Sequence, residues 1–212
     1  MRTLALATLL GSAAALTACA TAGDKADMKE ESVPTGPVTR EQIEAAVRAV
    51  RRSGLRFVDT ERVGLLGRSM GGGVVYNVLA VAPGLVDAAV VFAPVSSRAG
   101  DNFNRWIRDD PGRSGLSARI IRAYGAPERR PEFWREASPR NYFDRVTEPV
   151  LIHHGTADES CPIRWSRASY SALRRAGVDT RLFVYPGEPH AFIAAWPTSM
   201  RRTVRFFERN LD

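Results

Sequence analysis

Short unbroken apolar runs alternate along the chain with apolar stripes of helical spacing. The runs Ala88–Phe92 and Val150–His154 are bounded by prolines, as expected for strands that are buried on both faces of a parallel sheet. Two more runs cover Leu182–Tyr185 and Val63–Leu66, and the latter enters Gly67. Because parallel strands require crossover connections, this alternation predicts an α/β chain with a mostly parallel sheet and flanking helices.

The helical stripes lie before, between and after these runs. The first has the spacing of a capping box at Thr39 and Gln42 and ends near Gly54, and the second stops at Pro83-Gly84. Four sets of apolar residues have helical spacing, and the first follows i, i+3, i+4 and i+7: Ile43, Ala46, Val47 and Val50; Val74, Val75, Val78 and Leu79; Trp165, Ala168, Ala172, Leu173 and Ala176; Met200, Val204, Phe207 and Leu211.

The segment from Arg98 to Glu148 has no sustained period. It carries Trp106, Phe133, Trp134 and several prolines. We expect it to fold over the carboxyl edge of the sheet, where α/β proteins bind ligands, and to line an acyl pocket with its aromatic side chains.

Size and charge limit the possible functions. With 212 residues and 44% hydrophobic composition, the chain has apolar material for one core. Its formal charge of +7 comes almost wholly from arginines scattered between apolar positions. This pattern indicates a solvated basic surface, and we expect no nucleic-acid partner.

The N-terminus is typical of a targeting segment. Arg2 gives a positive start, Leu4–Ala15 is a short apolar stretch, and Leu16–Cys19 resembles the lipobox of bacterial lipoproteins. That resemblance implies a mature chain that begins at Cys19 and carries lipid on its thiol. An ordinary secretory peptide cleaved near the same site is the alternative, and both imply export.

The chain therefore divides into three predicted parts. Residues 1–18 form a lipoprotein-type signal peptide, residues 19–38 a polar, disordered tether, and residues 39–212 the catalytic domain. The expected location is the bacterial envelope, on the periplasmic side of the outer membrane, with Cys19 as the membrane anchor. Once Cys19 is lipidated, Cys161 is the remaining thiol, and we expect a small buried hydrophobe rather than a reactive group.

A nucleophile motif joins one predicted strand to the next helix. Gly67–Gly71 fits G-x-S-x-G, with Ser69 at the sharp turn and the helix amino terminus beneath it. A serine hydroxyl needs a base, and the base needs an acid that fixes its tautomer.

Asp158 and His190 can supply the acid and the base. They follow Ser69 in the order nucleophile, acid, base, which is the order in proteins with this nucleophile turn. Each follows an apolar run, so both lie on loops at the same edge of the sheet as Ser69. His153 and His154 are neighbours in a strand and point to opposite faces, which argues against a joint metal site. We expect no metal and no cofactor.

Four strings lie along the predicted strands and turns: Asp59–Val63, Gly67–Gly72, Pro149–Gly155 with Asp158, and Tyr185–His190. Together they resemble the catalytic domain of prolyl oligopeptidase-family enzymes, with an α/β-hydrolase fold, over residues 39–212. The resemblance implies hydrolysis of peptide or ester bonds through an acyl-serine intermediate, with Ser69 attacking, His190 carrying the proton and Asp158 orienting the ring. The Met70 amide is then one oxyanion donor.

The chain departs from this family at its N-terminal side. Strands that precede the helix at Thr39, and a loop with the second oxyanion donor, are not recognisable, so we expect about four strands from the C-terminal part of the sheet. An unpaired edge would favour a homo-oligomer. Three interpretations stay open: a serine peptidase or esterase, a dienelactone hydrolase-like carboxylesterase, and a truncated lipoprotein that keeps the triad without activity.

Overall fold

The structure is a computed structural model, and it describes residues 6–9, 40–56 and 58–211. Cys19, Thr39 and the predicted tether lie outside the described residues.

Five parallel strands form one sheet in the order β1-β2-β3-β4-β5. The four predicted strands are confirmed within about two residues at each end. The strands are β1 (Leu6–Leu9), β2 (Gly64–Arg68), β3 (Ala88–Phe92), β4 (Val150–Gly155) and β5 (Thr180–Tyr185).

The fifth strand, β1, comes from the segment predicted to be a signal peptide. It pairs with β2 from Leu6 opposite Gly64 to Leu9 opposite Gly67. The expectation of about four strands was therefore one short, because periodicity alone does not separate a short apolar targeting stretch from a buried strand. Cleavage before Cys19 would remove Leu6–Leu9, so a mature chain cannot both be cleaved there and keep β1. The cleavage stays a prediction.

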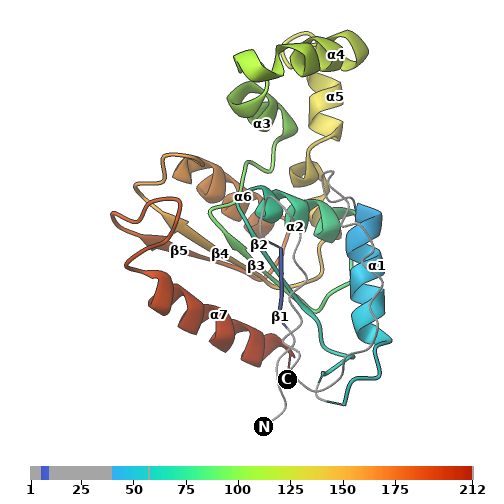
Figure 1. Cartoon of the computed structure of the whole chain (residues 1–212), viewed down its shortest axis with the longest axis vertical. Helices are drawn as coiled ribbons and strands as arrows, with labels where there is room; N and C mark the ends of the chain where they lie inside the picture. The colour runs from blue at the N-terminus through green and yellow to red at the C-terminus, as the bar shows by residue number, and fades with distance from the viewer. Residues whose placement is uncertain (1–5, 10–39, 57, 212) are drawn as a thin grey trace, which may run out of the picture.

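Helices cover both faces of the sheet (Figure 1). α1 (Arg40–Arg51), α2 (Met70–Val81) and α6 (Ile163–Arg175) pack on one face together with η2 (Pro139–Arg145), and α7 (Trp196–Leu211) packs on the other. All four predicted helices are confirmed. Among the described helices, none is long and apolar enough to cross a membrane.

The aperiodic segment forms a helical lobe that rises from the sheet (Figure 1). Its rings pack on one another: the centroids of Phe103 and Trp134 are 4.7 Å apart, and those of Tyr124 and Phe133 are 4.6 Å apart. These side chains hold the lobe together. The lobe comprises α3 (Ala99–Trp106), η1 (Pro111–Arg113), α4 (Ser114–Tyr124) and α5 (Pro131–Glu136).

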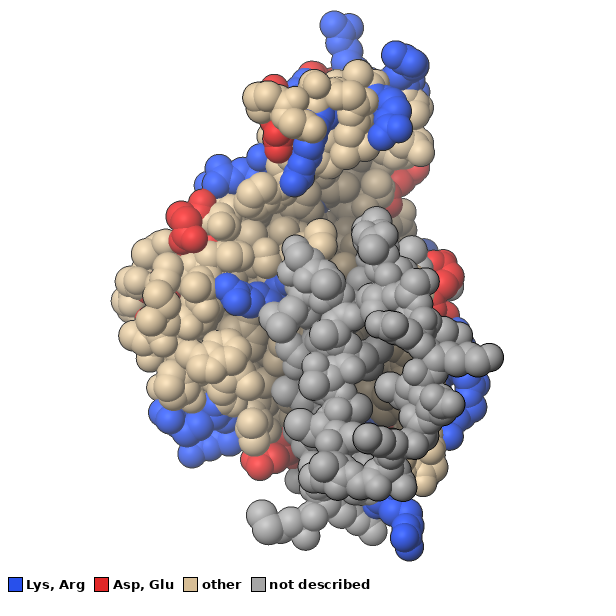
Figure 2. Space-filling model, in the orientation of Figure 1, with Lys and Arg blue, Asp and Glu red and all other residues tan. Residues whose placement is uncertain are grey.

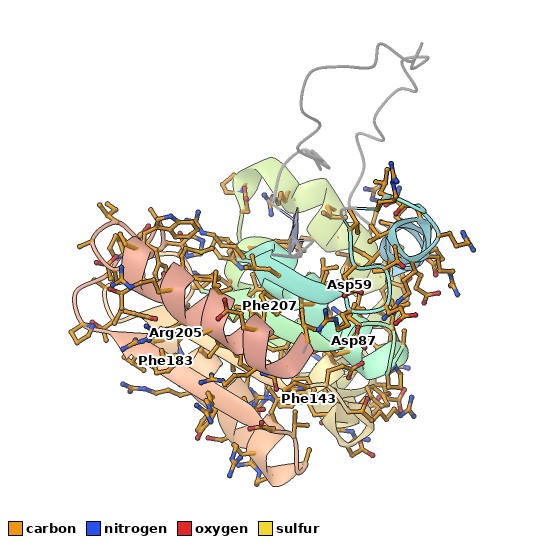
Figure 3. The ribbon with its side chains drawn as sticks, turned by 90° about the horizontal axis from the view of Figure 1, so that it is seen from below. Asp59, Asp87, Phe143, Phe183, Arg205 and Phe207 are labelled. Atoms are coloured by element: carbon orange, nitrogen blue, oxygen red, sulfur yellow. The ribbon has the colours of Figure 1, made fainter. Side chains whose placement is uncertain are left out.

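The start of β2 is fixed from two sides. Phe207 of α7, labelled in Figure 3, packs so closely on Gly64 that a Cβ added there would lie 2.5 Å from its ring. The Asp87 carboxylate accepts hydrogen bonds from the Val63 amide at 2.7 Å and from Arg51 at 3.1 Å. The strand that leads to Ser69 is thus held before the turn begins.

His153 is a fully buried member of β4. Its Nδ1 lies 2.8 Å from the Tyr185 hydroxyl, its Nε2 lies 3.1 Å from Thr203 Oγ1, and its ring stacks on Phe92. Burial, with a smaller effect of the Arg202 charge, lowers the pKa of His153 to about 3. The ring is therefore neutral wherever the protein is folded at moderate pH.

We predict that His153 makes the fold sensitive to acid. Below its ordinary pKa of 6.5 His153 is protonated in the unfolded state, whereas in the folded state it stays neutral down to about pH 3. The folded state therefore loses stability as the pH falls through this window. Between pH 7 and pH 4 this group removes roughly 3 kcal/mol from the free energy of unfolding. Urea unfolding of wild type and His153→Gln at both pH values measures the difference, and equal pH dependence in the two proteins would contradict it.

Candidate active site

Ser69 occupies a strained turn between β2 and α2. Its backbone has φ 54° and ψ −120°, a conformation that costs an ordinary residue roughly 1–3 kcal/mol. The Ser69 amide donates to Phe92 O at 2.9 Å, and the Ser69 carbonyl accepts from the Val95 amide at 3.1 Å. Only glycine fits at position 67, because a Cβ there would lie 2.3 Å from Gly71 O. The predicted elbow geometry is present.

Asp158 lies in the loop after β4, and its side chain is fully buried. Its Oδ1 accepts the amides of Ser160 at 2.9 Å and Cys161 at 2.7 Å. Burial, the largest single influence, raises the pKa of Asp158, but hydrogen bonds from His154, His190 and the Cys161 amide together hold it well below its usual value. The carboxylate is therefore ionised across the physiological range.

His190 lies in the loop after β5 and faces Asp158. Its Nδ1 is 2.9 Å from Oδ2 and 3.0 Å from Oδ1 of that carboxylate. Because an ionised carboxylate only accepts, Nδ1 carries the hydrogen, and in the neutral ring Nε2 keeps its lone pair. This is the tautomer that a general base needs.

Two further contacts hold the backbone of His190. Arg68, within the G-x-S-x-G motif, donates from Nη2 to the His190 carbonyl at 2.9 Å. The His190 amide donates to the Glu159 carboxylate at 3.2 Å. Sequence reasoning had assigned neither Arg68 nor Glu159 a role, since backbone contacts of this kind leave no mark in spacing.

The loops after β4 and β5 are joined backbone to backbone. A Cβ on Gly155 would lie 2.1 Å from Glu188 O, and the Ala157 amide donates to the same carbonyl at 3.0 Å. The buried Glu188 carboxylate accepts the amides of Ile193 at 2.7 Å and Ala195 at 2.9 Å. Glycine at 155 is thus required for the close approach that sets Asp158 against His190.

The Ser69 hydroxyl is close enough to the Cys161 thiol to lower its pKa, against the larger opposing effect of burial. Among the hydrogen bonds of the described residues, none joins Ser69 to His190. Cys161 is fully buried, as predicted, and burial, the largest influence, raises its pKa to about 12. The thiol is therefore protonated and acts as a neutral neighbour of the serine.

Met70 begins α2 directly after Ser69. Within the described part of the chain its amide has no hydrogen-bond acceptor, as the predicted role of an oxyanion donor requires. β1 ends beside the elbow, since Leu9 pairs with Gly67. A second donor is not identified among residues 6–9, 40–56 and 58–211.

His154 is a further member of this cluster that the sequence did not reveal. Its Nε2 lies 2.8 Å from Cys161 O and 3.2 Å from Asp158 Oδ2, and its Nδ1 lies 2.6 Å from Ser166 Oγ. A carbonyl only accepts, so Nε2 carries a hydrogen and directs it at the Asp158 carboxylate as well. The sequence placed His154 on the face opposite His153 but gave no partner, because Ser166 comes from α6.

The two adjacent histidines do point to opposite faces: His153 contacts β5 and α7, whereas His154 contacts α6 and the acid loop. Within the part of the chain that is described, no group of three or more His, Cys, Asp and Glu residues is placed to hold a metal ion.

Comparisons with known proteins agree on one family and fold. A model of the prolyl oligopeptidase family matches residues 34–212. Dipeptidyl peptidase 4 of Sus scrofa is 29% identical over 151 residues, which cover 70% of this chain and 18% of that protein. The chain thus spans about a fifth of the length of the curated relatives that it matches first.

Solved structures share the architecture. A puromycin-hydrolyzing peptidase of Mycobacterium tuberculosis has a TM-score of 0.65 at 23% identity, covering 81% of this chain and 25% of that one. A thermophilic esterase of Thermogutta terrifontis has a TM-score of 0.56 at 22% identity, covering 80% of this chain and 64% of that one. The predicted α/β-hydrolase fold is confirmed.

We predict that the His154 hydrogen bond positions Asp158. His154→Leu should slow covalent labelling of the chain by a fluorophosphonate roughly 10- to 100-fold, because a hydrogen bond to a charged group contributes about 1.5–3 kcal/mol. His154→Gln keeps an N–H near the same place and should restore most of the rate. His153→Gln, a change of its buried neighbour on the other face, is the control and should label normally. Equal losses in both His154 variants would contradict a positioning role.

Proposed function

Because this chain belongs to the prolyl oligopeptidase family of serine peptidases and related hydrolases, we propose that it is an exported serine hydrolase. It would cleave peptide or ester bonds through an acyl-serine intermediate. The proposal rests on one arrangement: His190, fixed by Asp158 through Nδ1, lies on the same sheet edge as Ser69 in its strained turn.

In this mechanism the Ser69 hydroxyl donates its hydrogen bond to His190 Nε2. As Oγ attacks the carbonyl carbon, its proton passes to Nε2, and Asp158 stabilises the charged imidazole. His190 then gives the proton to the leaving amine or alcohol, which leaves an acyl-serine. A water molecule, activated by the same Nε2, hydrolyses that ester and restores Ser69.

Negative charge on the carbonyl oxygen needs preorganised donors. The Met70 amide at the amino terminus of α2 supplies one. Loss of one such donor costs roughly 100- to 1,000-fold in turnover, so a chain with Met70 alone would be a slow but detectable catalyst.

An esterase is the second candidate. The chain covers 64% of the length of the Thermogutta terrifontis esterase, against 25% of the puromycin-hydrolyzing peptidase. Paired amide and ester substrates separate the candidates, since the amine leaving group depends on protonation by His190 far more than an activated alcohol does. A truncated lipoprotein without activity is the third, and failure to label with a fluorophosphonate would favour it.

The location is also part of the proposal. A lipid on Cys19 would hold the protein on the periplasmic side of the outer membrane. Removal of residues 1–18 would take β1 with it and leave β2 as an edge strand, which a second copy of the chain could pair with. Membrane attachment and a homo-oligomer therefore follow from the same cleavage.

We predict that Ser69→Ala abolishes labelling by a fluorophosphonate. His190→Ala should reduce turnover of an activated ester about as severely, because nucleophile and base act as one unit. Asp158→Asn should lower turnover about 10,000-fold, because the amide favours the wrong tautomer of the His190 imidazole. Mass spectrometry of the labelled protein and initial rates test all three, and a label retained in Ser69→Ala would place the nucleophile elsewhere.

We predict that the mature protein begins at Cys19 and carries several acyl chains, which together bind a membrane far more firmly than one myristoyl-sized chain does. Intact mass of the protein purified from bacterial envelopes measures both the start and the modification. Cys19→Ser should remove the lipid and release the protein from the membrane fraction. A mature chain that still contains Leu6–Leu9 would refute this prediction and would keep β1 in the sheet.

A further inference from the structure

We propose that a basic pocket beside the predicted catalytic residues binds a carboxylate of the substrate, which deepens the proposed function and rests on it. The pocket has a volume of about 520 Å³ and lies between α3, η2 and α6. Four arginines and one acid lie in its wall, together with Trp165: Arg98, Arg105, Arg140, Arg164 and Asp101.

The positive charge of this pocket is not neutralised by the described part of the protein. None of its four guanidinium groups forms an ion pair there, whereas arginines elsewhere do, such as Arg51 with Asp87 and Arg130 with Glu132. The single carboxylate, that of Asp101, accepts the Ser96 hydroxyl at 2.6 Å. Four cations thus face one anion across one cavity, an arrangement that favours an anionic ligand.

Arg140 is the half-buried member of the group. Its amide and Nε donate to the carbonyl and hydroxyl of Ser97 at 3.3 and 3.1 Å, which fixes its position. Burial lowers the pKa of Arg140, and the neighbouring charge of Arg98 lowers it further. The two cations therefore repel each other in the free protein, and a bound anion would relieve that repulsion.

The pocket reaches the catalytic loops through Arg105. Its Nη2 donates to Glu159 O at 2.9 Å, and the Glu159 carboxylate accepts the His190 amide. The charge of Arg105 also acts on the Cys161 thiol, which neighbours Ser69. An anion held among the arginines would thus lie next to the loop that positions His190, where a substrate bound at Ser69 could supply it.

A carboxylate fits this chemistry because a guanidinium presents a planar pair of N–H donors that matches its two oxygens. In peptide or ester substrates the available carboxylates are a free chain end and an acidic side chain. Arg164 lies 6.0 Å from the Trp165 ring centroid, so the wall also offers an aromatic surface next to a cation.

Calorimetric titration of the purified chain with glutarate tests the pocket without any need for turnover. We expect glutarate to bind at least tenfold more tightly than uncharged glutaramide and to slow fluorophosphonate labelling of Ser69. Arg98→Gln and Arg164→Gln change exposed side chains and should each weaken glutarate binding about fivefold or more. Arg201→Gln on α7, at the opposite face, is the matched control and should leave it unchanged.

Two peptides then distinguish the source of the carboxylate: acetyl-Ala-Ala with a free chain end, and acetyl-Ala-Glu amide with an acidic side chain. Tighter binding of either one than of acetyl-Ala-Ala amide supports the proposal and identifies the source. Glutarate binding that is insensitive to both arginine changes would overturn it, as would inorganic phosphate binding tenfold more tightly than glutarate. If the fluorophosphonate fails to label the protein even when no glutarate is present, that result contradicts the proposed function alone. The pocket is tested separately, because the titration measures glutarate binding directly.

Discussion

One buried carboxylate, that of Asp158, organises the loops at the carboxyl edge of the sheet. A charge with no exposed surface is stable only when donors surround it, because an unpaired buried ion costs several kcal/mol. Asp158 has four: the rings of His154 and His190 and the amides of Ser160 and Cys161. Each donor comes from a segment that must then adopt one conformation. The tautomer of His190, the path of the acid loop and the position of Cys161 beside Ser69 all depend on this ion.

The parallel sheet brings the three predicted catalytic residues to one edge, but glycines set the distances. Gly67 allows the chain to turn back on Gly71, and Gly155 allows the acid loop to touch the backbone of Glu188. The strain at Ser69 is offset by hydrogen bonds to the strand and loop of β3, from the Ser69 amide to Phe92 and from Val95 to Ser69. Rigid support on both sides of the nucleophile is what keeps an unfavourable backbone conformation in place.

Sequence patterns predicted whatever depends on local periodicity or on chain order. Buried strands such as β3 and β4 are continuous apolar runs, and the order of Ser69, Asp158 and His190 follows from the order of the strands. Features made by several distant segments were not predictable. His154 needs Ser166 from another element, and the basic pocket draws Arg98, Arg140 and Arg164 from three, so neither leaves a spacing in the sequence. The aromatic residues of the lobe were identified as one group, but their packing on each other could be seen only in the structure.

The first residues of the chain face two incompatible demands. As β1, Leu6–Leu9 pairs with the strand that carries the elbow and ends beside Gly67, where the turn to Ser69 begins. As part of a signal peptide, the same apolar residues are removed, and the backbone groups of β2 from Gly64 to Gly67 lose their partners. Unpaired groups of this kind must bind water or another strand, so export would weaken the support of the elbow unless a new strand replaces β1. Both roles need a short apolar segment, and for that reason one sequence satisfies both patterns. If the chain is exported as proposed, catalysis would therefore depend on which chain covers the edge of β2, because that strand leads directly into Ser69.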